Sequence, residues 1–106
     1  MKNPGLSDEI IEMLNSVFYK YPDIKKVVLF GSRAKGTAKN NSDIDLAIFG
    51  IENDLFVESI AVELEELPLP YKFDIKSFTS IRNLALCEHI KRVGIIIYEK
   101  TGDMKR

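Results

Sequence analysis

The stretch from Leu29 to Ile48 reads LFGSRAKGTAKNNSDIDLAI, and its spacing decides the fold. An apolar run ends at Gly31-Ser32, a polar segment follows, and a second apolar run opens with Asp43 and Asp45. Side chains two residues apart on a strand project to the same face, so these carboxylates are expected to lie together. Adjacent carboxylates repel each other unless they share a proton or a cation lies between them. A divalent cation with oxygen ligands, most simply Mg²⁺, is therefore expected at this pair.

The composition is that of an ordinary globular chain. Hydrophobic residues make up 45% and charged residues 29% of the 106 residues, a length that suits one domain. We therefore expect residues 1–106 to form a single domain, with Thr101 to Arg106 as a frayed polar tail. The net charge of −1 offers no basic field for nucleic acid, and no apolar run approaches the length of a membrane span. The lone Cys87 excludes an internal disulfide and suits a reducing cytoplasm.

Apolar periodicity and breakers predict helices that alternate with strands. Ser7 is expected to cap the first helix, which ends before Tyr21-Pro22. Further helices are expected over residues 33–38, 53–67 and 80–92, and strands over residues 24–30, 43–49, 71–78 and 95–98. The fold class is then α/β, with one sheet and helices packed against it. The connections do not require every strand to be parallel.

Gly31-Ser32 lies between a strand and a helix, a position suited to phosphate binding. Glycine lets a ligand approach the main chain, and the first N–H groups of a helix carry positive partial charge. Arg33 and Lys35 can add positive charge nearby, although a solvated surface position would explain either of them equally well. The G-K-[ST] of a Walker A loop is missing at the required spacing. Taken alone, the Gly-Ser pair is equally well an ordinary turn.

Asp74 is a third candidate carboxylate. The run from Tyr71 to Phe78 alternates, with apolar residues on one face and Lys72, Asp74 and Lys76 on the other. Pairing with the flanking lysines would explain Asp74 without a functional role. If Asp74 instead converges with the aspartate pair, the three carboxylates form a two-metal site of the kind used for phosphoryl or nucleotidyl transfer.

The motif resembles the signature of the minimal nucleotidyltransferases (MNT) of the DNA polymerase β superfamily. The matching elements are Gly31-Ser32, ten intervening residues and Asp43-Ile44-Asp45, while the later hydrophobic-Asp-hydrophobic strand matches Phe73-Asp74-Ile75. The resemblance implies a mixed sheet flanked by helices, as in the polymerase β palm. It also implies Mg²⁺-dependent transfer of a nucleoside monophosphate from an NTP.

Roles for individual residues follow from the resemblance. The nucleotide would be bound by Gly31, Ser32, Arg33 and Lys35. Two Mg²⁺ ions would be held by the catalytic carboxylates Asp43, Asp45 and Asp74. Many members of the family are antitoxins that pair with a small helical HEPN protein, in some cases by adenylylating a tyrosine of the toxin. We therefore expect AMP transfer from ATP to such a partner, in a type VII-like toxin–antitoxin system.

The main alternative is a non-catalytic antitoxin or regulatory subunit that neutralises its partner by binding. A nucleic-acid-binding domain ranks below it, because the chain is slightly acidic. The intact aspartates favour the enzyme, since a binding module has no need of mutually repelling carboxylates. Nothing in the sequence resembles a platform for the base or the acceptor, so we expect the acceptor's own surface or another subunit to complete the site.

The remaining candidates are interpreted as structural. Cys87 and His89 share the last predicted helix, but one Cys and one His are too few ligands for zinc, so packing or surface positions are expected. Two aromatic and apolar groups are candidate contact patches, although core or boundary positions are the more frequent role of such residues. These groups are Phe18, Tyr19 and Tyr21, and Leu67, Leu69 and Tyr71.

Overall fold

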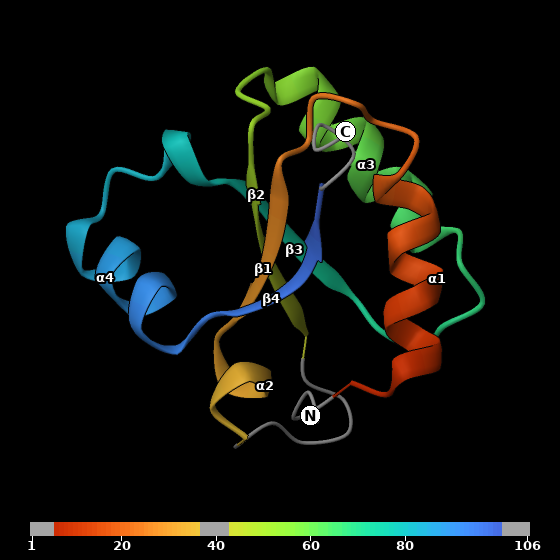
Figure 1. Ribbon diagram of the computed structural model, residues 1–106, viewed down its shortest axis with the longest axis horizontal. Coiled ribbons are helices and arrows are strands. Elements are labelled where there is room, and N and C mark those ends of the chain that lie inside the picture. Colours follow the sequence, from red (N-terminus) through yellow and green to blue (C-terminus); the bar gives the residue numbers. More distant parts are fainter. Residues whose placement is uncertain (1–5, 37–42, 101–106) are drawn as a thin grey trace.

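A computed structural model describes residues 6–36 and 43–100, which form one four-stranded sheet with helices on both faces (Figure 1). The longer elements are α1 (Asp8–Phe18), β1 (Lys26–Phe30), β2 (Ile44–Phe49), α3 (Asp54–Glu65), β3 (Phe73–Ser77), α4 (Leu84–Val93) and β4 (Ile95–Glu99). Two single turns complete the order, α2 (Ser32–Lys35) and the 3-10 turn η1 (Phe78–Ser80). The expected helix end at Ala38 and the expected tail from Thr101 lie outside the described residues. Within the described ranges, no helix has the length and apolar character needed to cross a bilayer.

The strand order is β3-β2-β1-β4, and the directions are mixed. β1 lies antiparallel to both β2 and β4, whereas β2 and β3 are parallel and are joined through α3. The expectation of a mixed sheet flanked by helices is therefore confirmed. The pairing sets Asp45 of β2 opposite Phe30 of β1 on one side and opposite Asp74 of β3 on the other.

Polar side chains fix where the long helices begin. Ser7, Asn53 and Asn83 each cap a helix through the side-chain oxygen, at α1, α3 and α4 respectively. The expected start of the last helix at Ser80 is wrong. Phe78–Ser80 forms a separate 3-10 turn, and α4 begins only after Asn83, whose Oδ1 accepts a hydrogen bond from the Leu86 N–H at 3.1 Å. This cap satisfies a donor that the first turn leaves without an intrahelical partner, and it outweighs the apolar periodicity before it.

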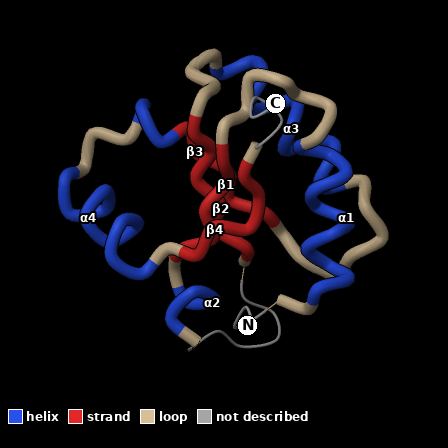
Figure 2. Tube along the Cα trace, viewed as in Figure 1, coloured by secondary structure: helices blue, strands red, loops and turns tan. Residues whose placement is uncertain are grey.

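The two faces of the sheet are covered unequally. The larger core lies on the side of α1 and α3, where β2 contributes the fully buried Ile44, Leu46 and Ile48. Because side chains alternate along a strand, Asp45 and Ala47 face the other side of the sheet. That is the side of α4, which lies across the strands from α1 (Figure 2). The buried cluster on that side is small and consists of Val28, Phe30, Ala47 and Ile90. The carboxylates therefore lie on the less covered face.

Most of the candidate contact patches prove to be core or boundary residues. Phe18 is fully buried, and the margin of the larger core includes Tyr21, Leu67, Leu69 and Tyr71. Tyr19 differs from these residues, because 82% of it is exposed. These side chains mainly stabilise the fold and leave only Tyr19 for a contact outside it.

Candidate active site

β1 ends in a turn at Gly31, whose backbone conformation other residues rarely adopt. Its φ is 77° and its ψ is −154°, and its carbonyl accepts a hydrogen bond from the Lys35 N–H at 3.1 Å across the single turn of α2. A Cβ at this position would overlap Oδ2 of Asp45 and lie 3.2 Å from its Cγ. The absence of a side chain therefore brings the Asp45 carboxylate directly against the turn. The Gly-Ser turn and the aspartate motif form one site.

The carboxylates of β2 and β3 share a face of the sheet. Asp45 and Asp74 occupy the same register position of the parallel pair. Phe73 and Ile75 pack against the larger core, so Asp74 lies on the opposite face, together with Asp45. Burial raises the pKa of Asp45, and the negative charges of Asp74 and the exposed Asp43 raise it further. Asp45 therefore interacts electrostatically with both other carboxylates.

Two cations partly balance this negative charge. Nζ of Lys76 lies 3.4 Å from Oδ1 of Asp74, and the exposed fractions of the two side chains are 40% and 48%. The charges of Lys76 and Arg33 also act against the rise in the pKa of Asp45. The simple interpretation of Asp74 as a lysine-paired strand residue is thus partly correct. The pairing involves Lys76, and Lys72 forms no ion pair within residues 6–36 and 43–100.

Arg33 is buried, whereas the sequence left open a solvated position. Only 4% of the residue is exposed, and its guanidinium carbon lies 4.7 Å from the centroid of the Tyr71 ring. Lys35 is exposed at the end of α2. Arg33 therefore contributes its charge from inside the fold, while Lys35 contributes its charge at the surface.

The donor set suits a hard divalent cation. Mutual repulsion contributes to the raised pKa of Asp45, and a bound cation would relieve that repulsion. Among the residues that the structure describes, no three His, Cys, Asp or Glu side chains are arranged to hold a metal ion by themselves. Mg²⁺ commonly takes one or two protein carboxylates and completes its shell with water and substrate phosphates. The site therefore fits Mg²⁺ that binds together with a nucleotide.

His89 is a site residue that the sequence analysis missed. Its Nε2 accepts a hydrogen bond from the Gly31 N–H at 3.3 Å, although 58 residues separate the two. The imidazole also meets the Phe30 ring edge-on, with centroids 6.3 Å apart. The interpretation of His89 as a packing or surface position is incomplete, since α4 holds it against the turn. The only signal in the sequence was its spacing from Leu86 and Ile90 on one helix face.

The comparison with known families agrees with this geometry. Residues 12–103 match the family model described as polymerase beta, nucleotidyltransferase. The match spans most of the chain, and the chain therefore belongs to this family of nucleotidyltransferases. The resemblance inferred from the Gly-Ser and aspartate motifs is confirmed at this level.

Similar proteins indicate which kind of nucleotidyltransferase this chain resembles. The protein adenylyltransferase MntA of Aphanizomenon flos-aquae is 29% identical, over 90% of this chain and 70% of its own length. MntA of Haemophilus influenzae is also 29% identical, over 95% of this chain and 90% of its own length. A crystal structure of a toxin–antitoxin with AMP-PNP has a TM-score of 0.70 at 25% identity and covers 92% of this chain and 77% of the matched one. The same fold occurs in the complex of a tri-AMPylated Shewanella oneidensis HEPN toxin with an MNT antitoxin, at TM-score 0.68 and 18% identity over 92% and 76% of the two chains.

The Gly31 contact can be tested against a matched glycine. Gly36 also has a positive φ of 79°, but among residues 6–36 and 43–100 a Cβ there would meet nothing within 4 Å. Gly36→Ala should cost about 1 kcal/mol of unfolding free energy, the usual penalty of a left-handed backbone. Gly31→Ala should cost more, because its backbone region is nearly glycine-specific and its Cβ overlaps Asp45. Urea unfolding measures both, and equal losses would contradict the close approach of Asp45.

The hydrogen bond from Gly31 to His89 predicts a local change in hydrogen exchange. His89→Ala leaves the Gly31 N–H without its acceptor. A long hydrogen bond of this kind contributes about 0.5–1 kcal/mol, so the Gly31 amide should exchange several-fold faster. The control is Ala at the exposed neighbour Glu88. Unchanged exchange at Gly31 in His89→Ala would show that the imidazole does not hold the turn.

The raised pKa of Asp45 gives the sign of a pH dependence. The pKa of Asp45 in the folded state lies above its ordinary value, so ionised Asp45 destabilises the fold at neutral pH. This destabilisation disappears as the pH falls, first through the pKa of the folded state and then through that of the unfolded state. Asp45→Asn should therefore be more stable than the natural chain at pH 7, with the difference shrinking toward pH about 4. Urea unfolding at both pH values measures this, and a difference independent of pH would contradict it.

Proposed function

We propose that the chain is a Mg²⁺-dependent adenylyltransferase that moves AMP from ATP onto a hydroxyl of a protein partner. The observation that carries the proposal is the contact of the Asp45 carboxylate with Gly31, with Asp74 in register beside it. A phosphate turn next to paired carboxylates is the arrangement that nucleotidyl transfer requires. We further propose that the partner is a small helical HEPN-type protein and its acceptor a tyrosine, so that the chain acts as an antitoxin.

In this mechanism each residue of the site has a stated role. The triphosphate is bound at Gly31 and Ser32, with Arg33 behind the turn and Lys35 beside it. Mg²⁺ would be held by Asp43, Asp45 and Asp74, and when bound it neutralises phosphate charge and activates the attacking hydroxyl. Asp74 also helps to remove the proton of the acceptor hydroxyl. The acceptor oxygen forms a bond to the α-phosphorus, the bond from the α-phosphorus to the bridging oxygen breaks, and pyrophosphate leaves.

The relatives support both the donor and the partner. The MntA protein of Aphanizomenon flos-aquae is a protein adenylyltransferase, and the toxin–antitoxin structure with TM-score 0.70 contains AMP-PNP. The activity of this relative and the nucleotide in this structure favour ATP over other nucleoside triphosphates as the donor. A cytoplasmic setting, where ATP and Mg²⁺ are plentiful, belongs to the same proposal, as does the view that residues 1–106 act as one minimal domain.

A second candidate is an antitoxin that acts by binding alone. The ion pair between Lys76 and Asp74 favours it, because Asp74 already has a positive partner within the chain. The two candidates differ in what happens to the partner. The enzyme leaves one or more AMP units on it, whereas the binding module neutralises it at unchanged mass.

The test is transfer of label from α-labelled ATP to a HEPN-type protein isolated from the same host. With Mg²⁺ the natural chain should label the partner, and EDTA should abolish the labelling. The variants Asp43→Asn, Asp45→Asn and Asp74→Asn should each lose about 10²-fold or more, as is typical when a group that stabilises transition-state charge is removed. Glu65→Gln, at an exposed carboxylate at the end of α3, is the control. Full labelling by Asp45→Asn would rule out the mechanism.

A further inference from the structure

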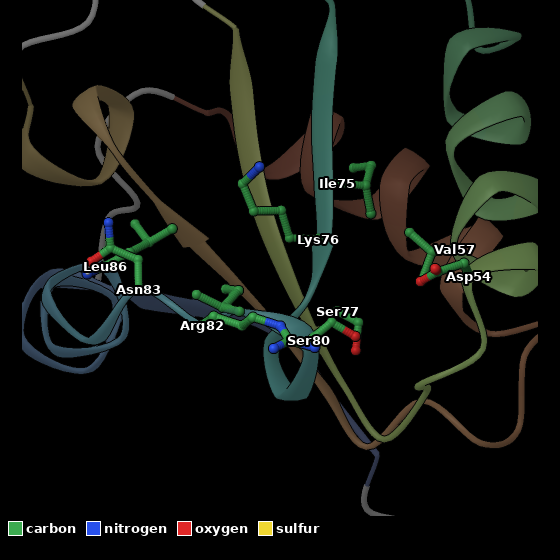
Figure 3. A pocket seen from close by; sticks show the side chains of 10 residues that line it. Asp54, Val57, Ile75, Lys76, Ser77, Ser80, Arg82, Asn83 and Leu86 are labelled. Atoms are coloured by element: carbon green, nitrogen blue, oxygen red, sulfur yellow. Dashed lines mark hydrogen bonds between the residues drawn. The ribbon is translucent and has the colours of Figure 1, made fainter.

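A groove runs over the outer edge of β3, between the starts of α3 and α4 (Figure 3). Its volume is about 370 Å³. The strand residues Ile75 and Lys76 form the floor and leave β3 in opposite directions, as Figure 3 shows. One wall is Val57 of α3, and the other includes Arg82 and Leu86. We call this feature the edge groove.

The floor of the edge groove offers main-chain groups to a ligand. β3 is an edge strand, and the carbonyl of Lys72 points toward β2, where it accepts a hydrogen bond from the Ile44 N–H at 2.8 Å. Main-chain groups alternate between the two sides of a strand, so those of Phe73 and Ile75 point to the open edge. Within the described residues, no hydrogen bond reaches them. At the other edge strand, by contrast, the Asn15 amide donates to the Ile97 carbonyl of β4 at 3.1 Å.

Two exposed apolar side chains each directly follow a residue that lines the edge groove, and we call them its rim. Leu55 follows Asp54 at the start of α3 and is 73% exposed, and Leu84 follows Asn83 at the start of α4 and is 79% exposed. Large aliphatic side chains this exposed gain free energy when another surface covers them. They stand at the starts of the two helices whose first turns border the groove. Open main-chain groups with an apolar rim are the features by which an edge strand receives an extended peptide.

The edge groove is continuous with the candidate active site. Asp74 lies on β3 between Phe73 and Ile75, and Lys76 of the groove pairs with it at 3.4 Å. A strand added to β3 would lie about 4.8 Å away and place every second side chain on the face that carries Asp74. A hydroxyl-bearing residue at the matching position would then lie beside Asp74. A residue two positions along would lie next to Lys76, with Arg82 nearby, where an acidic side chain fits.

We propose that the edge groove binds an extended segment of the acceptor protein, which adds as a strand to β3 and presents its hydroxyl beside Asp74. This inference rests on the proposed function for the identity of the acceptor. The segment is non-helical over the residues that pair, because a helix already uses its own main-chain groups. It bears the acceptor hydroxyl and an acidic residue two positions away. The groove thereby supplies the acceptor side of the reaction, for which the sequence shows no platform.

Hydrogen exchange gives a test that does not depend on catalysis. The chain is mixed with the HEPN-type protein isolated from the same host, in AMP-PNP and Mg²⁺ so that no transfer occurs. The amides of Phe73 and Ile75 should exchange at least tenfold more slowly in the complex. Those of Asp74 and Lys76 point toward β2 and should be protected with or without the partner. Unchanged exchange at Phe73 and Ile75 in a formed complex overturns the proposal.

Variants of the two rim leucines provide a second test of the edge groove. Leu84→Asp and Leu55→Asp should each weaken partner binding by tenfold or more, with AMP-PNP binding unchanged. Val62→Asp is the matched control, since Val62 is 57% exposed on α3 but lies away from the start of that helix, and this variant should bind as the natural chain does. Rim variants that bind and label the partner normally overturn the groove and leave the proposed function standing. If a complex forms but no label is transferred, the proposed function is wrong. Hydrogen exchange at Phe73 and Ile75 then tests by itself whether the groove binds the partner. If no complex forms, both proposals fall.

Discussion

The contact between the Asp45 carboxylate and Gly31 is the constraint on which the rest of the site depends. It requires a residue without a side chain at the end of β1 and an aspartate opposite Phe30 on β2. Once these are in place, the parallel pairing of β2 with β3 puts Asp74 next to Asp45. The Gly-Ser turn, the aspartate pair and the third carboxylate are thus positioned by strands of one sheet.

Because the two faces of the sheet are covered unequally, the fold tolerates the unfavourable free energy of these carboxylates. The side of α1 and α3 holds most of the buried apolar residues, so the fold depends less on apolar burial on the α4 side. On the α4 side, carboxylates that repel each other remain partly hydrated, and Lys76 and Arg33 offset part of their charge. The strain of the site is therefore electrostatic and local, and it is concentrated at Asp45.

Sequence patterns predicted the features that depend on residues close together in the chain. The cap at Ser7, the helix expected from Asn53, the alternation of β3 and the mixed sheet are confirmed, because each follows from neighbouring residues or from the family motif. The start of α4 was placed too early, because the Asn83 cap was not recognised. The burial of Arg33 on Tyr71 and the reach of His89 to Gly31 depend on packing between distant segments, which periodicity and spacing do not encode. The metal and nucleotide roles of the aspartates and the Gly-Ser turn stay predictions.

The long span of the hydrogen bond between Gly31 and His89 has a consequence for synthesis on the ribosome. A nascent chain that has emerged as far as β2 contains Gly31, Asp43 and Asp45, yet it contains neither Asp74 nor His89. Closing such long loops is entropically costly. It is achieved only when the connection from β2 through α3 to β3 has formed and α4 has packed against the sheet. The site therefore assembles late, after nearly all of the described chain has folded. A fragment produced by premature termination or proteolysis within α3 keeps the Gly-Ser and Asp-Ile-Asp parts of the signature, but it lacks Asp74 and His89 and has no assembled site.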